Sequence, residues 1–192
     1  MSELFENYGD LAKVERSAFK MTGRVSLGSS DYSSSELMLV KCMDYRCWAV
    51  EGYAVTGDGP DLGRDRDLVL RAERALAFGH FKAVLLLAHD DCGATKDAMR
   101  NPSASDSDIS KWSVVRHEEN LRVMLHSWKI RYAVSEKGVK VFSAYLAHDK
   151  AGEWNQLCKL QELTPLFANC DSLCKSTSGF RCNPESFLFE RN

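Results

Sequence analysis

Two thiols and an imidazole have types and a spacing that suit a metal ion. His89 and Cys92 form a short His-x-x-Cys segment, and Cys42 follows an apolar run earlier in the chain. Zinc prefers thiolate and imidazole ligands, and three protein ligands leave its fourth tetrahedral position open, as in catalytic sites. If the two segments meet in space, Cys42, His89 and Cys92 predict a catalytic zinc site. The alternative for each residue taken singly is a buried core side chain.

A carboxylate and a guanidinium follow the first of these thiols at short spacing. Asp44 lies two residues after Cys42, and Arg46 lies two residues further on. An arginine can hold a carboxylate through paired hydrogen bonds, and a carboxylate so placed can accept a hydrogen bond from solvent on the metal. We therefore predict catalytic roles for Asp44 and Arg46. The alternative is a surface ion pair of little energetic value.

The elements around these residues predict that the ligands lie at the ends of neighbouring strands. The apolar runs at 37–40 and 83–88 are typical of strands buried on both faces of a parallel sheet. Apolar positions between 67 and 78 follow the helical period, which gives the order strand, helix, strand and favours parallel pairing. Functional residues of open parallel sheets collect where the strands end. Residues 93–99 indicate a helix start, whose positive end would favour the Cys92 thiolate.

The rest of the chain completes an α/β pattern with a mainly parallel sheet flanked by helices. Residues 1–28 carry apolar side chains at nearly helical spacing, which predicts an amphipathic arm. A long amphipathic helix is expected around 114–128, and a third strand at 138–146. The segment from residue 155 onward is less regular, and there we predict only a helix near 156–167.

Composition indicates one soluble, folded domain. The chain has 192 residues, of which 44% are hydrophobic and 27% charged. A formal net charge of -2 leaves no cationic excess to hold nucleic acid. The first residues are acidic and no apolar stretch approaches the ~20 residues that span a bilayer, so we expect neither a secretory signal nor a membrane helix. Seven cysteines, an odd number, suit a reducing compartment and a cytoplasmic location.

Two segments together resemble the paired signature of the β-class carbonic anhydrases. They are Cys42-Met43-Asp44-Tyr45-Arg46 and His89-Asp90-Asp91-Cys92-Gly93-Ala94, in the expected order and each at a predicted strand end. The resemblance implies that Cys42, His89 and Cys92 bind Zn²⁺ and that Asp44 and Arg46 form the family's Asp-Arg dyad. In some members that aspartate binds the zinc directly and closes the site. The resemblance also places Gly93 and Tyr45 at the substrate pocket.

The activity that this resemblance implies is hydration of carbon dioxide to bicarbonate by zinc-bound hydroxide. It also implies a homodimer or a dimer of dimers, in which the N-terminal helix crosses onto the partner. Three departures touch the pocket wall, namely Ala88 before the histidine, Tyr45 within the dyad and the lack of an Asn-Ala-Gly stretch. Hydrolysis of carbonyl sulfide or carbon disulfide at the same site is therefore the alternative. A catalytically silent zinc protein that senses bicarbonate or scaffolds an assembly is the second.

The resulting layout is a single domain over 1–192, with a helical arm at 1–35, the zinc-site core at 36–152 and a C-terminal extension at 153–192. A second zinc site could involve four later cysteines, Cys158, Cys170, Cys174 and Cys182. Their spacing is not that of a standard zinc knuckle, so free or packed thiols are favoured. The other histidines are expected to be exposed or structural, although one could shuttle protons: His80, His117, His126 and His148.

Overall fold

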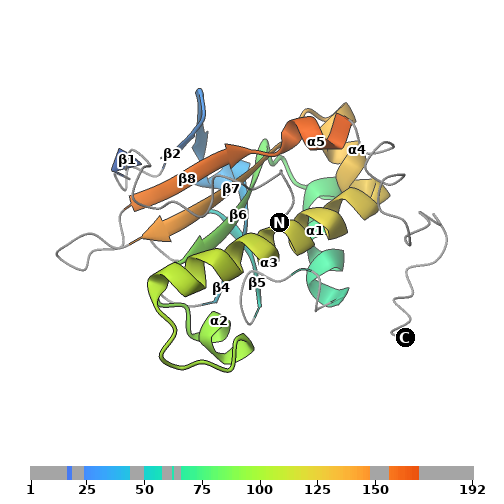
Figure 1. Ribbon diagram of the computed structural model, residues 1–192. Helices are drawn as coiled ribbons and strands as arrows, with labels where there is room; N and C mark the ends of the chain where they lie inside the picture. The colour runs from blue at the N-terminus through green and yellow to red at the C-terminus, as the bar shows by residue number, and fades with distance from the viewer. Residues whose placement is uncertain are drawn as a thin grey trace.

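A six-stranded sheet forms the centre of the computed structural model, which describes residues 17–18, 24–43, 50–57, 62, 66–147 and 156–168 (Figure 1). Across the sheet, the strands are β1 (Ser17–Ala18), β8 (Gln156–Glu162), β7 (Lys140–Ala147), β6 (Ala83–His89), β4 (Leu37–Cys42) and β5 (Tyr53–Gly57). The four strands β7, β6, β4 and β5 are parallel, whereas β8 and β1 pair antiparallel. The predicted mainly parallel sheet is confirmed.

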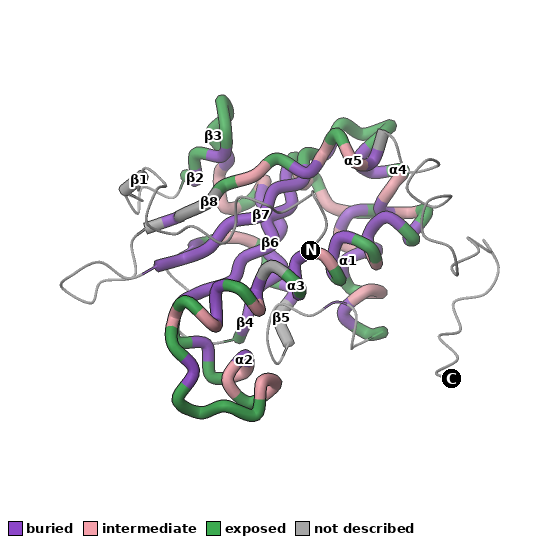
Figure 2. The backbone as a smooth tube through the Cα atoms, in the orientation of Figure 1, coloured by how far each residue is buried: buried purple, intermediate pink, exposed green. Residues whose placement is uncertain are grey.

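The central strands form because their apolar runs are buried on both faces. Every residue of β4 and β6 is buried, and Figure 2 shows these strands at the buried centre of the molecule. Successive side chains of a strand point to opposite faces of the sheet. Accordingly, Val84 and Leu86 belong to one apolar cluster, while Leu85 and Leu87 belong to another. The strands predicted from the two apolar runs are confirmed.

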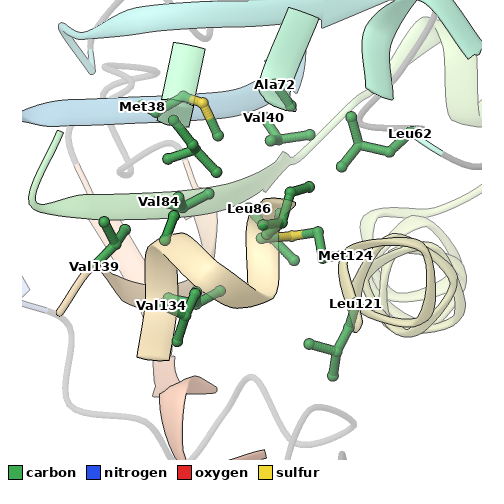
Figure 3. Packing of buried hydrophobic residues seen from close by; sticks show 14 of the residues in the cluster. Met38, Val40, Leu62, Ala72, Val84, Leu86, Leu121, Met124, Val134 and Val139 are labelled. Atoms are coloured by element: carbon green, nitrogen blue, oxygen red, sulfur yellow. The ribbon is translucent and has the colours of Figure 1, made fainter. Parts of the chain in front are cut away.

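Helices cover one face of this sheet. Side chains of α1 (Arg66–Phe78), α3 (Asp106–His126), α4 (Trp128–Glu136) and α5 (Thr164–Ala168) join the cluster that contains Leu86. Figure 3 shows Met124 of α3 beside Leu86 of β6 within this packing. The predicted helix between 67 and 78 is confirmed as α1. None of the helices among the described residues has the length and apolarity needed to cross a membrane.

Local hydrogen bonds decide where the long helical segment begins and breaks. Ser105 is the N-cap of α3: its hydroxyl accepts the Asp108 N–H at 3.2 Å, and the Asp108 carboxylate accepts the Ser105 N–H at 3.2 Å. Ser127 ends α3 and caps α4, where its hydroxyl accepts the Ile130 N–H at 3.2 Å. The helix predicted around 114–128 therefore begins earlier than expected, and a second helix follows it.

The helical arm predicted over residues 1–35 is wrong for its described part. A hairpin of β2 (Arg24–Leu27) and β3 (Ser30–Ser33) and the short 3-10 helix η3 (Ser34–Glu36) occupy this region, while Ser17–Ala18 pairs with β8. A two-residue turn joins the strands, and its Gly28 takes a positive φ of 62°. Val25, Leu27 and Tyr32 pack on the sheet face opposite the helices. Residues 1–16 and 19–23 lie outside the described residues.

The helix predicted near 156–167 is also wrong over most of its length. Residues 156–162 form β8, and only Thr164–Ala168 is helical. The edge of β7 presents backbone groups that β8 pairs, whereas a helix there would leave them without strand partners. Thr164 completes the edge, because its hydroxyl accepts the Val141 N–H at 2.9 Å. The strand predicted at 138–146 is confirmed as β7.

His117 on α3 makes stability depend on pH. The side chain is fully buried, and burial lowers its pKa to about 3 from the ordinary 6.5. Between pH 6.5 and 3 the unfolded chain binds a proton that the folded chain excludes, so stability falls as the pH drops through this window. Between pH 7 and 5 the loss is about 2 kcal/mol.

Urea unfolding at pH 7 and pH 5 measures this effect, with His117→Gln as the comparison. The glutamine does not titrate, so the fall in unfolding free energy between the two pH values should be smaller by about 2 kcal/mol in the variant. The comparison of slopes is independent of any change that the substitution makes at pH 7. Equal pH dependence in the two proteins would contradict the assignment to His117.

Candidate metal centre

The sheet topology brings the ends of β4 and β6 together. The two strands are adjacent and parallel, with Lys41 in register with Leu87, so their carboxyl ends lie at the same edge of the sheet. Cys42 is the last residue of β4, and His89 is the last residue of β6. Parallel pairing therefore places these two side chains beside each other although 46 residues separate them in the chain.

Cys92 completes a compact cluster with these two residues. The two Sγ atoms and a ring nitrogen of His89 all lie within 4.8 Å of one another. The cluster is buried, with exposed fractions of 4% for Cys42, 0% for His89 and 1% for Cys92. Neither thiol belongs to a disulfide. Three donor atoms that converge in a buried place could hold a metal ion.

The short turn between His89 and Cys92 sets the orientation of the imidazole. Asp91 adopts a positive φ of 49°, which reverses the chain direction after β6. His89 Nδ1 lies 2.7 Å from the Asp90 carbonyl oxygen. A carbonyl only accepts, so Nδ1 carries the proton and Nε2 of the neutral ring keeps the lone pair that a metal requires.

Cys92 lies in surroundings that favour its thiolate. It is the N-cap of α2 (Gly93–Ala98), as the sequence predicted for the helix start. The Cys42 thiol is the main cause that lowers the pKa of Cys92, to about 4, and His89 and Thr95 lower it further, while burial opposes them. A thiolate is the form of cysteine that binds metals.

The turn is tied to three other elements through its two aspartates. The Asp90 N–H donates to the Leu146 carbonyl of β7 at 3.0 Å. The Asp91 N–H donates to Asp106 Oδ1, in the first turn of α3, at 2.9 Å. The Asp91 carboxylate forms an ion pair with Lys96 of α2. These contacts hold the segment that carries His89 and Cys92.

Sequence reasoning did not single out Asp106 and Tyr145. Asp106 follows the N-cap of α3, a position where an acidic residue is common for reasons that have nothing to do with a metal. Tyr145 lies in β7 and is fully buried, with its hydroxyl close to Asp90, Asp106 and Cys92. Burial and the Asp90 carboxylate raise its pKa. The available signal was a phenol in a buried strand in which Ser143 is the other buried residue with a hydroxyl.

Other residues predicted for the site stay predictions. Asp44, Tyr45 and Arg46 lie outside the described residues, as do most of the later cysteines, and nothing is described of the Cys158 side chain. Gly93 lines a pocket of 530 Å³ together with Lys96, Asp97, Arg100, Asn101 and Pro102. Its neighbour Ala94 instead packs against Cys42 and Cys92. The pocket therefore lies on the outer side of α2, away from the two thiols.

Solved structures with the same fold are β-carbonic anhydrases. One of two tetrameric enzymes from Sordaria macrospora matches with a TM-score of 0.52 and 16% identity, over 68% of this chain and 81% of the other. CafA from Aspergillus fumigatus matches with a TM-score of 0.53 and 16% identity, over 73% and 83%. CafD from the same fungus gives 0.51 and 9%, over 76% and 99%.

Comparison by sequence gives no corresponding match. No protein-family model and no curated protein matches the chain. At identities of 16% and below, the structural likeness shows the fold. The chain thus has the fold of the β-carbonic anhydrases, and it carries a buried Cys-His-Cys cluster at the carboxyl edge of the parallel sheet.

Proposed function

We propose that this chain, which folds as the β-carbonic anhydrases do, binds one zinc ion through Cys42, His89 and Cys92 and hydrates carbon dioxide to bicarbonate. The single observation that carries the proposal is the convergence of three donor atoms within 4.8 Å in a buried cluster. Two thiolates and one imidazole are ligands that zinc prefers, and three of them leave one tetrahedral position open. The donor set therefore fits a catalytic zinc site.

The residues of the cluster supply the conditions that such an ion requires. The low pKa of Cys92 keeps a thiolate available at neutral pH, and the hydrogen bond at Nδ1 orients the His89 ring. When bound, zinc supplies a Lewis acid that lowers the pKa of water and so provides a nucleophile near neutral pH. Burial of all three donors excludes competing bulk water from the ligands.

The proposed mechanism also assigns roles to the dyad of Asp44 and Arg46. Asp44 would accept a hydrogen bond from the attacking oxygen at a carboxylate oxygen and aim its remaining lone pair at the carbon of the substrate. Arg46 would hold Asp44 by a paired hydrogen bond and keep it from taking the open metal position. Both roles rest on the spacing of these residues from Cys42 and on the resemblance of the motif.

We also propose that the chain forms a homodimer or a dimer of dimers. The enzymes of Sordaria macrospora with this fold are tetrameric. In the described part of the chain, β5 is an edge strand of the sheet, and its Tyr53 has 47% of its surface exposed. An edge strand presents backbone groups that another chain can pair. Light scattering on the purified chain measures the assembly.

One preparation assayed with two substrates tests the proposed reaction. We expect proton release from dissolved carbon dioxide, followed by stopped flow with a pH indicator, at a rate well above the uncatalysed one. Hydrogen sulfide release from carbonyl sulfide should be much slower. Elemental analysis of the same sample should find about one zinc per chain.

The outcomes separate the candidate functions. Fast release of hydrogen sulfide with slow hydration would replace the proposed substrate by carbonyl sulfide, which the same site would attack. Stoichiometric zinc without turnover of either substrate would indicate a silent zinc protein. A chain purified without any transition metal would contradict the proposed metal site and therefore the proposed reaction.

A further inference from the structure

The Tyr145 hydroxyl occupies an unusual place beneath the candidate metal centre. Tyr145 pairs in register with Ala88, the residue before His89, and its exposed fraction is 0%. Its hydroxyl oxygen is shielded from solvent, and no hydrogen bond of ordinary length reaches it from the described residues. A buried hydroxyl left without a partner costs about 1–3 kcal/mol. Its position therefore calls for an explanation.

Three titratable groups lie near enough to this hydroxyl to act on its charge. They are the carboxylates of Asp90 and Asp106 and the thiol of Cys92. Asp90 is itself buried, with 7% exposure, and lies between the two ligands of the turn. Among groups near the phenol, Asp90 acts on it most strongly, and it raises the pKa of Tyr145 in addition to burial. A phenol carries its proton at neutral pH, so the Tyr145 hydroxyl can donate to the Asp90 carboxylate.

We propose that Tyr145 is a positioning residue of the metal centre, whose hydroxyl donates to the Asp90 carboxylate and so holds His89 and Cys92 in the geometry that binds the ion. This inference rests on the proposed metal site. The backbone hydrogen bond between Asp90 and Leu146 already joins the turn to β7. The proposed contact of the Tyr145 side chain adds a second link to the same strand. A second contact to this strand restricts movement of the Asp90 side of the turn, while the Asp91 side is held by Asp106 and Lys96.

The expected effect follows from what holds the ligands. Partners that orient metal ligands from outside the ligand set change metal affinity by about 10–100-fold when they are removed. Tyr145→Phe keeps the ring that fills the space beside Ala88 and removes only the hydroxyl. We expect this variant to bind zinc about 10–100-fold more weakly than the unaltered chain.

The test measures zinc affinity of the full chain by competition with a chromophoric chelator, without any substrate. A second readout is the visible spectrum of the Co²⁺ form, in which thiolate charge-transfer and ligand-field bands report the geometry of the donors. Tyr145→Phe should weaken zinc binding and shift these bands. Its free energy of unfolding in excess chelator, measured with urea, should change by no more than about 1 kcal/mol, the net contribution of one intramolecular hydrogen bond.

Two further variants make the test specific. Ser143→Ala is the matched control, since it removes another buried hydroxyl two residues earlier in β7 that makes no hydrogen bond with the described residues. It should leave zinc affinity and the Co²⁺ spectrum unchanged. Asp90→Ala should weaken zinc binding as Tyr145→Phe does. The zinc affinity of the double variant should be no lower than that of the single variant with the lower affinity, because the two side chains act as one unit.

The outcomes for the unaltered chain and for the variants are read separately. A Tyr145→Phe protein with unaltered zinc affinity and Co²⁺ spectrum overturns the positioning role while the proposed function stands. Equal weakening by Ser143→Ala, or additive losses in the double variant, also overturns it. An unaltered chain that binds neither metal overturns the proposed function together with this inference, before any variant is measured.

Discussion

Cys92→Ser should abolish stoichiometric zinc binding and carbon dioxide hydration together, with a loss of at least about 100-fold in both. Cys92 is 1% exposed and lies with Cys42 and His89 in the cluster, so its replacement leaves two of the three donors that converge among the described residues. A serine hydroxyl is nearly isosteric but stays protonated at neutral pH, whereas the Cys42 thiol beside Cys92 holds the pKa of Cys92 well below its ordinary range. Elemental analysis and stopped-flow hydration measure the two losses.

Asp44→Asn is the contrasting variant for this prediction. The proposed role of Asp44 is to orient the attacking oxygen, so its amide should leave about one zinc per chain and lower the hydration rate, on the order of 100-fold. Asp44→Asn should lose activity and keep its metal, whereas Cys92→Ser should lose both. This difference distinguishes the role of a metal ligand from the role of the dyad. Normal hydration in both variants would refute the mechanism.

Leu86→Ala should lower the free energy of unfolding by about 3 kcal/mol. Leu86 is fully buried in the middle of β6, with β4 on one side and β7 on the other. Its side chain packs with Val40 and Met124 between the sheet and the helices (Figure 3). Neighbours on rigid strands cannot collapse into the space that the truncation leaves, so a cavity adds to the lost transfer free energy.

Urea unfolding measures this change, with Leu160→Ala as the matched control. Leu160 lies on β8 with 38% of its surface exposed, so the same truncation there should lower stability by less than about 1 kcal/mol. Metal content of the folded Leu86→Ala protein should stay at that of the unaltered chain. Equal losses for the two leucines would contradict the assignment of Leu86 to the main core.

Strands buried on both faces were predictable from the sequence because their environment is uniform. Most residues of β4 and β6 meet apolar neighbours on both faces of the sheet, so a short apolar run suits them. The α1 helix has one buried and one exposed side, which gives a helical period that is equally direct. These elements also carry or connect the ligands, so the candidate site was predicted along with them.

The helical arm over residues 1–35 and the helix near 156–167 were predicted wrongly because their environment is not uniform. Leu157, Leu160 and Leu163 have a spacing close to the helical period, yet the first two lie in β8. The backbone of β7 needed a partner at its open edge, and that requirement comes from a strand outside the segment. In the same way, Val25 and Tyr32 meet in a hairpin because the sheet offers an apolar face that the local pattern does not reveal.

The sequence by itself determined the chemistry of the candidate centre: two thiols, one imidazole and the spacing of His89 and Cys92. Side-chain type sets donor preference, and that property needs no folded chain. The tertiary structure added the distance, within 4.8 Å, at which the predicted Cys42 joins them, and it alone placed Asp106 and Tyr145 near the turn between the other two. Parallel pairing joins segments far apart in the chain, and neither local pattern nor spacing encodes which buried side chains then meet.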